Sequence, residues 1–295
     1  MSKTGMINTG DCHVHMLLDG EDFRKAIDMH RENGPIDAVV RERLQKYKDA
    51  GVTFLRDGGD AFGVCGRAKQ LASEYGIDYR SPAFPIYKKG HYGAFIGRGF
   101  SDMDEYKALV KTAKEEGADF IKLMISGIMD FDNYGVLIGD GLSPEEIQTM
   151  IDIAHDEGFA VMAHCNGAAN IRAALAASVD SIEHGAYMDD ECIEMLSMSD
   201  TVWVPTVAPI ANLVGCERFS DDVLKQIVLK HIENINRVWF LGGMIALGTD
   251  AGAFAVPHAD AIQSEYTFLK NAINDKEFEM HLLTSQEQIA WRFKR

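Results

Sequence analysis

The fold is decided by the stretch Ser143–His164, which reads SPEEIQTMIDIAHDEGFAVMAH. A serine followed by Pro144 and two acidic residues is typical of a helix start, because the serine caps free backbone N–H groups and proline fits the first turn. Gly158 is expected to end this helix, and the apolar run Ala160–Ala163 follows it. The stretch therefore predicts a helix, a glycine turn, a short buried strand and a polar residue where the strand ends.

The same order of helix, glycine, strand and polar loop recurs along the chain. Strands that alternate with helices imply right-handed crossovers and a parallel sheet. Repeated units over 295 residues favour an α/β fold of the (β/α)8 TIM-barrel type, with one domain covering 1–295. A doubly wound open sheet is the alternative, but no glycine-rich phosphate loop follows the first strand. The predicted strands are Met6–Cys12, Val52–Arg56, Asp78–Phe84, Phe120–Ile125, Ala160–Ala163, Ser181–Glu183, Val202–Pro205 and Met244–Gly248.

Composition narrows the classes of partner. With 29 basic and 45 acidic residues, the formal net charge is −16, which disfavours binding to nucleic acid or to an anionic membrane. No apolar stretch is long enough to span a membrane, and no signal peptide is recognised. Five cysteines without a CxxC pair argue against a disulfide framework. We therefore expect a cytoplasmic protein that acts on a small-molecule substrate, and a homo-oligomer stays open.

Barrel enzymes carry their active sites at the carboxyl ends of the strands. The first predicted strand leads into His13 and His15, which are two residues apart, face the same way and can share one metal ion. Lys122 lies inside an apolar strand, where an amine is costly to bury unless it is paired or modified. It either reaches solvent at the strand end or reacts with carbon dioxide to give a carbamate that bridges two metal ions.

Three later strands also end in potential metal ligands, namely His164, His184 and Asp250. Imidazole and carboxylate groups bind zinc and its neighbours. Glycines flank Asp250 and let ligands approach closely. A chance HxH pair or a hydrogen-bonded histidine explains any one of these residues, but not all of them in this order.

The combination of HxH, a strand lysine, two later strand-end histidines and a final aspartate resembles the amidohydrolase superfamily. The phrases IKLMISG, VMAHCNG, SIEHGAYMDDE and ALGTDAG are similar to its imidazolonepropionase-like and Xaa-Pro-dipeptidase-like branch. The resemblance implies a binuclear site with two divalent metal ions, for which zinc is the expected metal. It implies that His13, His15 and Asp250 hold one ion, that His164 and His184 hold the other, and that a carboxylated Lys122 bridges them with a hydroxide.

The chain departs from the family pattern in two ways. Many relatives carry a small β-sandwich, but here the first strand begins near residue 6 and 45 residues follow Asp250, so we expect the sandwich to be absent. Carboxypeptidase-like relatives often have a tyrosine two places after the fifth-strand histidine, where this chain has Asn166. The candidates for substrate contacts are Asn166, His91 in the loop over 90–101, and His258.

The resemblance implies hydrolysis of an amide C–N bond, with Asp250 moving the proton and the carbamate on Lys122 fixing the metals. An esterase, lactonase or phosphotriesterase with the same site is an alternative. A mononuclear deaminase is another, although it leaves Lys122 without a role, and a metal-binding scaffold without catalysis is a further one. Arg56 and Asp57, at the end of the second strand, are expected to buttress the barrel rather than to bind substrate.

Overall fold

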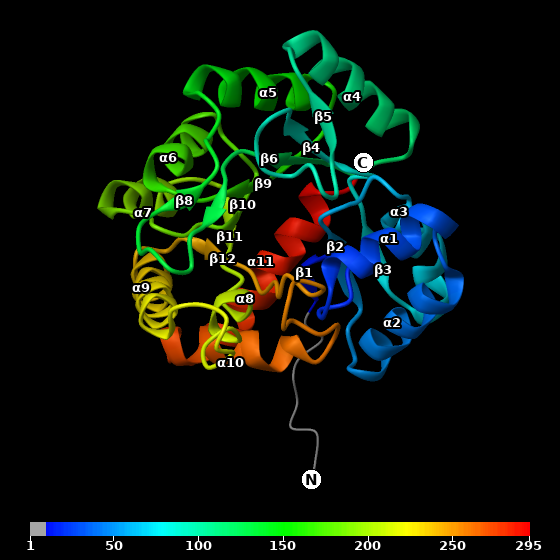
Figure 1. The fold of residues 1–295 in the computed structure, drawn as a ribbon. Coiled ribbons are helices and arrows are strands. Elements are labelled where there is room, and N and C mark those ends of the chain that lie inside the picture. The colour runs from blue at the N-terminus through cyan, green and yellow to red at the C-terminus, as the bar shows by residue number, and fades with distance from the viewer. Residues whose placement is uncertain (1–9) are drawn as a thin grey trace.

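The structure is a computed structural model that describes residues 10–295, so positions 6–9 of the first predicted strand lie outside the described residues. Figure 1 shows helices arranged around a central group of strands. Within the described residues, no helix is long and apolar enough to cross a membrane. The α-helices are α1 Phe23–Asn33, α2 Asp37–Asp49, α3 Val64–Ala72, α4 Met103–Glu115, α5 Pro144–Asp156, α6 Ala168–Ala176, α7 Asp190–Ser197, α8 Ala208–Ala211, α9 Asp221–Phe240, α10 Ala261–Ile273 and α11 Phe278–Arg292, and a 3-10 turn covers Ser73–Tyr75.

Each of the eight predicted strands overlaps a strand of the structure, and the additional strands are short. The strands are β1 Asp11–Val14, β2 Phe54–Asp57, β3 Asp78–Arg80, β4 Pro85–Lys88, β5 Arg98–Phe100, β6 Ile121–Met124, β7 Ile128–Met129, β8 Leu137–Ile138, β9 Val161–Cys165, β10 Ser181–His184, β11 Val202–Val204 and β12 Met244–Ile245. The helix predicted from Ser143 forms as α5, with Ser143 and Glu146 making a reciprocal capping box.

The strands form two parallel sheets in which most neighbours follow chain order, while β5 lies at the edge beyond β4. A seven-stranded sheet has the order β12-β11-β10-β9-β6-β4-β5, and a separate sheet has the order β1-β2-β3. β7 and β8 form an antiparallel hairpin. The order from β6 to β12 does not reverse, as it would at the switch point of a doubly wound sheet. The parallel α/β prediction is therefore confirmed.

The expected closed barrel does not form as one continuous ladder. The third predicted strand, Asp78–Phe84, forms only as β3, and after a break over 81–84 the next strand, β4, begins at Pro85. Pro82 offers no N–H to a ladder there, and Ala83 has a φ of 63°. The two sheets consequently do not pair across this break, and the prediction of a closed barrel is corrected to two parallel sheets.

The other seam, between the first strand and the segment after β12, is joined by local hydrogen bonds. The Cys12 amide donates to the Leu247 carbonyl at 2.9 Å, and the Asp250 amide donates to the His13 carbonyl at 2.7 Å. Asp250 has a φ of 58°, outside the strand region, so this segment bonds to β1 without forming a regular ladder.

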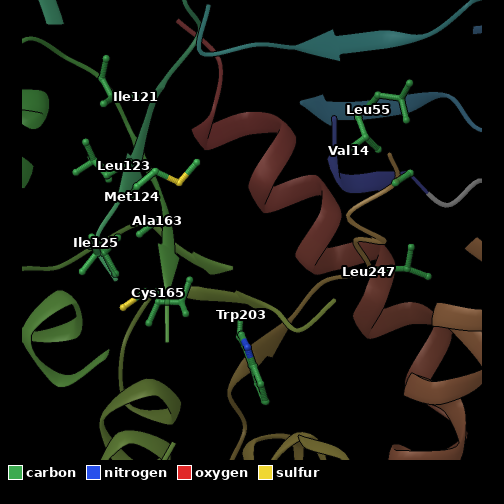
Figure 2. Close-up of a cluster of buried hydrophobic side chains, with 14 of the residues drawn as sticks. Val14, Leu55, Ile121, Leu123, Met124, Ile125, Ala163, Cys165, Trp203 and Leu247 are labelled. Atoms are coloured by element: carbon green, nitrogen blue, oxygen red, sulfur yellow. The ribbon is translucent and has the colours of Figure 1, made fainter. Parts of the chain in front are cut away.

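Alternate strand residues pack outward against the helices. Figure 2 shows Leu123 and Ile125 pointing to one side of β6 and its continuation, while Met124 between them points to the other side. Leu123 and Ile125 belong to the large buried cluster that Leu55 of β2 and Trp203 of β11 also join. Burial of this apolar surface is the main term that stabilises the ring of helices on the strands.

A second cluster fills the inner side of the strands at their amino-terminal ends. Phe54, Phe120 and Met162 pack there with Ile289 and Phe293 at the end of the chain. Helix α11 crosses the centre of the molecule in Figure 1, consistent with its covering this end. The opposite end, where the strands point their carboxyl termini, is left for a site.

Candidate metal centre

Six polar side chains, which lie in the strands or follow them, line one cavity of about 800 Å³. All six were predicted from the sequence as metal-centre residues, and all but Asp250 are buried. They are His13, His15, Lys122, His164, His184 and Asp250.

A break in the regular pairing of β1 with β2 turns His13 and His15 toward the cavity. The register between β1 and β2 shifts by one residue, which is a β-bulge. Strict alternation would put Cys12 and His13 on opposite sides of the strand. Instead, Cys12 packs in the inner cluster and His13 lines the cavity above it, and His15 follows on the same side.

His13, His15 and Asp250 bring three ligand atoms together. His15 Nε2 lies 3.3 Å from Asp250 Oδ1, and His13 Nε2 lies 3.5 Å from the same oxygen. The two Nε2 atoms are 3.4 Å apart. Ligand atoms of all three residues lie within 4.8 Å of one another, so the trio could hold a metal ion.

Glu183, to which the sequence analysis gave no role, orients the first histidine. Its Oε2 accepts a hydrogen bond from His13 Nδ1 at 2.7 Å, and its Oε1 accepts from Arg56 Nη2 at 2.8 Å and from the Ser181 hydroxyl at 2.6 Å. Burial alone would raise the pKa of Glu183, but Arg56 and His13 outweigh it and bring that pKa to about 2. Because a carboxylate only accepts, Nδ1 of His13 carries the hydrogen and Nε2 keeps a lone pair for a metal.

Arg56 serves the same network rather than the substrate. Its Nε donates to the Cys12 carbonyl at 2.7 Å, and its Nη1 donates to the Ser181 hydroxyl at 2.8 Å. Its guanidinium also lies 4.5 Å from the ring centroid of Phe293. Arg56 does not line the cavity and ties β1, β2 and β10 together, in agreement with the buttressing role predicted for it.

His164 and His184 form a second pair beside the first. Their ring centroids are 4.6 Å apart, and the ring of His184 is 5.1 Å from that of His13. Thr206 Oγ1 lies 2.7 Å from His184 Nδ1, and the Gly127 carbonyl lies 3.2 Å from His164 Nε2. Burial lowers the pKa of His164 to about 3 and that of His184 well below its usual value. Both rings are therefore neutral, and each has one nitrogen held and the other free to bind a metal.

Lys122 is a buried amine without a partner. Its side chain is 1% exposed, and within residues 10–295 its Nζ makes no hydrogen bond. Burial lowers the pKa of Lys122 to about 8, so a substantial fraction is neutral near physiological pH. An unpaired amine among neutral histidines and a carboxylate fits a group that binds an ion or becomes a carbamate.

Residues 11–284 match the model of the amidohydrolase family. The chain belongs to this family. Its parallel strands, with histidines, a lysine and an aspartate gathered at one end, agree with that assignment.

The chain has curated relatives of moderate similarity. It is 29% identical over 203 residues to ochratoxinase from Aspergillus niger, covering 65% of this chain and 39% of that protein. It is 32% identical over 194 residues to an uncharacterized protein of Mycobacterium tuberculosis, covering 62% of this chain and 48% of that protein. The chain thus spans less than half the length of either relative.

Solved structures share the fold of the amidohydrolase. A Xaa-Pro dipeptidase with bound methionine superimposes with a TM-score of 0.74 at 20% identity, covering 96% of this chain and 75% of that one. Ochratoxinase of A. niger superimposes with a TM-score of 0.75 at 21% identity, covering 94% and 71%.

Asn166 does not line the cavity, although it follows β9 directly. Its Nδ2 donates to the Gly127 carbonyl at 3.3 Å, the same oxygen that lies 3.2 Å from His164 Nε2, and its Oδ1 accepts from the Ala186 amide at 3.0 Å. These bonds tie together the loops after β6, β9 and β10. Asn166 therefore shares the Gly127 carbonyl with His164 and holds the loop around that ring, and its contact with substrate stays a prediction.

His91 and His258 also lie outside the cavity lining. His91 Nδ1 is 3.0 Å from the Asp140 carbonyl. His258 is buried between the Leu18 carbonyl at 2.8 Å and the Tyr47 hydroxyl at 3.1 Å. Both rings are engaged in linking loops, and contact of either residue with substrate stays a prediction.

The loop over 90–101 nevertheless reaches the cavity through the residue next to His91. Tyr92 lines the cavity and stacks on His164, with ring centroids 4.8 Å apart. Phe95 and Ile96 of the same loop also line it. The prediction that this loop contributes to the site is therefore supported. Which of its side chains reach the cavity depends on the directions in which they point, which the sequence does not give.

Proposed function

We propose that this amidohydrolase is a binuclear metal-dependent hydrolase that cleaves an amide C–N bond of a small substrate. The observation that carries the proposal is the convergence of six potential ligands from separate strand ends on one cavity. A cavity of about 800 Å³ suits a small molecule. We also propose that the two parallel sheets together surround this site as the strands of one (β/α)8 barrel.

The donor set fits two zinc ions. His13, His15 and Asp250 would hold one ion, and His164 and His184 would hold the other. The carbamate formed from the neutral amine of Lys122 and carbon dioxide, with release of one proton, would bind both. When bound, divalent ions lower the pKa of a coordinated water and polarise a substrate carbonyl.

The chain's own residues supply the rest of the chemistry. Asp250 lines the cavity and would accept a proton from the nucleophile and return it to the leaving amine. Glu183 keeps His13 in the metal-binding tautomer. The similarity to a Xaa-Pro dipeptidase, named for the cleavage of a peptide bond, supports an amide as the scissile group.

The test is hydrolysis by zinc-loaded protein of a panel of amides, with esters and phosphotriesters beside them. We expect turnover of an amide and a loss of about 10²- to 10⁴-fold in kcat for Asp250→Asn. The exposed Asp222 of α9 provides the matched control Asp222→Asn, which should leave the rate unchanged. Zinc binding without turnover of any substrate in the panel would show a scaffold, and hydrolysis of esters alone would move the activity to that class.

The carbamate has a separate test. Protein equilibrated with ¹³C-bicarbonate and zinc should show a carbamate carbonyl resonance in its ¹³C NMR spectrum, and Lys122→Met should lack it. A resonance of equal intensity in the variant, or none in either protein, would contradict the modification.

A further inference from the structure

The side chains that line the cavity differ between its buried inner part and its exposed opening. The floor is made of buried histidines and Lys122. The same cavity is lined farther out by aromatic side chains and, among exposed residues, by Arg24 and Arg218. A substrate that fills the cavity therefore meets apolar rings and then guanidinium groups as it extends away from the metal ligands.

One wall is a continuous series of rings that leads from the metal centre to Arg24. Tyr92 stacks on His164 at 4.8 Å, and Phe95 meets Tyr92 edge-on at 5.6 Å. Phe23 in turn meets Phe95 at 5.9 Å. The guanidinium of Arg24 lies 5.5 Å from the ring centroid of Phe23. Each step joins residues that line the cavity, so the wall is apolar along its length and cationic at its end.

A second wall ends in Arg218 in the same way. Phe131 and Phe219 meet edge-on with centroids 5.2 Å apart. The guanidinium of Arg218 lies 5.1 Å from the ring of Phe219 and 4.9 Å from the ring of Phe254. Stacking on a ring holds a guanidinium plane while its N–H edge stays free to bind a carboxylate.

Neither arginine is neutralised by an ion pair. Within residues 10–295 no carboxylate lies within 4.0 Å of the guanidinium of Arg24 or Arg218, whereas Arg31 on the same helix as Arg24 pairs with Asp28. Glu21 and Asp22 also line the cavity, but Asp22 accepts hydrogen bonds from the first backbone amides of α1. Glu21 and Asp22 keep their charges on the same lining, so the two arginines do not make the opening cationic as a whole. What sets Arg24 and Arg218 apart is that, among residues 10–295, no carboxylate within 4.0 Å occupies their N–H edges, which are therefore free to bind an anion.

We propose that Arg24 and Arg218 form an anion-binding subsite at the mouth of the cavity. The substrate is then an elongated amide with a ring-bearing apolar segment and a carboxylate at the end remote from the scissile bond. This assignment rests on the proposed hydrolase function for the position of the amide, while the anion subsite itself can be tested by binding alone.

The kinetic test uses a matched pair of substrates with zinc-loaded protein. One is 3-(4-carboxyphenyl)propanoyl p-nitroanilide, and the other is its analogue without the carboxylate. We expect Arg24→Gln and Arg218→Gln each to lower kcat/KM for the carboxylated substrate by about three- to tenfold. The analogue should change less than twofold, and Arg31→Gln should affect neither. An equal fall for both substrates, or no fall for the carboxylated one, would overturn the subsite.

A binding test separates failure of the subsite from failure of the hydrolase function. Calorimetric titration of the same protein should give tighter binding of 4-phenylbutyrate than of 4-phenylbutanamide, and the Arg24→Gln/Arg218→Gln double variant should lose most of this difference. If neither anilide is hydrolysed, the proposed function fails for this substrate series while the binding difference still supports the subsite. Equal dissociation constants for the two ligands, or an unchanged difference in the double variant, would refute it.

Discussion

Replacing Lys122 by methionine should stabilise the protein when metal is absent and remove the stabilisation that metal provides. The lysine side chain is 1% exposed, and within the described residues its amine has no hydrogen-bond partner. Burial lowers the pKa of Lys122 from 10.5 to about 8. Since each pH unit between those values corresponds to about 1.4 kcal/mol, keeping the ammonium buried at pH 7 costs roughly 3 kcal/mol. Methionine is similar in length and carries no charge.

The assay is urea unfolding of chelator-treated protein at several pH values. At pH 7 the free energy of unfolding of Lys122→Met should exceed that of the wild type by roughly 1–3 kcal/mol. The pKa of Lys122 is lower in the folded protein than in the unfolded chain. The free-energy cost of burying its ammonium is therefore complete below about pH 8 and disappears as the pH approaches 10.5. The difference between the two proteins should therefore shrink over this window.

Adding zinc should reverse the ranking, because ligand binding stabilises the folded wild type and Lys122→Met lacks the bridging group. The exposed Lys111 of α4 gives the control Lys111→Met, for which we expect a change within about 0.5 kcal/mol under every condition. A metal-free Lys122→Met protein that is less stable than the wild type would show that burial of the Lys122 amine does not destabilise the metal-free protein, and would refute this reasoning.

Three other predictions address the surroundings of the site. Glu183→Gln weakens the acceptor for His13 and should lower zinc affinity by about 10- to 100-fold in a competition titration with a chromophoric chelator; unchanged affinity would count against its orienting role. Phe293→Ala opens the inner cluster and should cost about 3–5 kcal/mol in urea unfolding, whereas Trp291→Ala, 76% exposed, should cost far less; equal costs would contradict the packing given for α11. Asp180 lies 2.8 Å from His155 Nε2 and raises the pKa of His155. This ion pair therefore stabilises the folded protein fully below about pH 6.5, the unfolded pKa of histidine. The stabilisation is lost as the pH rises through the higher pKa of the folded state. The melting temperature of His155→Gln should therefore lie below that of the wild type by more at pH 6 than at pH 8.5. The ion pair should contribute at most about 1 kcal/mol to the free energy of unfolding. A difference in melting temperature that does not change with pH would show that the pair does not act by charge.

The principal site residues could be predicted because they follow from strand periodicity and chain order. His13 and His15 are two residues apart at a strand end, His164 and His184 lie in the last two residues of β9 and β10, and Asp250 comes after β12. Parallel strands bring their carboxyl ends together whatever the loops do. Buried helices with strong start signals, such as α5, were predictable for a similarly local reason.

What the sequence could not provide depends on contacts between distant segments. The carboxylate of Glu183 meets His13 across 170 residues, and no local pattern distinguishes it from a packing residue. The bulge in β1 and the break over 81–84 are set by how neighbouring strands fit. His91 lies one residue from Tyr92, yet only the tyrosine reaches the cavity. A position near a strand end is therefore a weaker indicator of substrate contact than of metal binding.

The central claim is that separate strand ends form one binuclear metal centre. Anomalous diffraction at the zinc edge, from crystals grown with zinc, tests it most directly. We predict two adjacent peaks, one beside His13, His15 and Asp250 and one beside His164 and His184, with density extending from Lys122 between them. A cavity without peaks, or zinc bound solely elsewhere on the molecule, would contradict the claim.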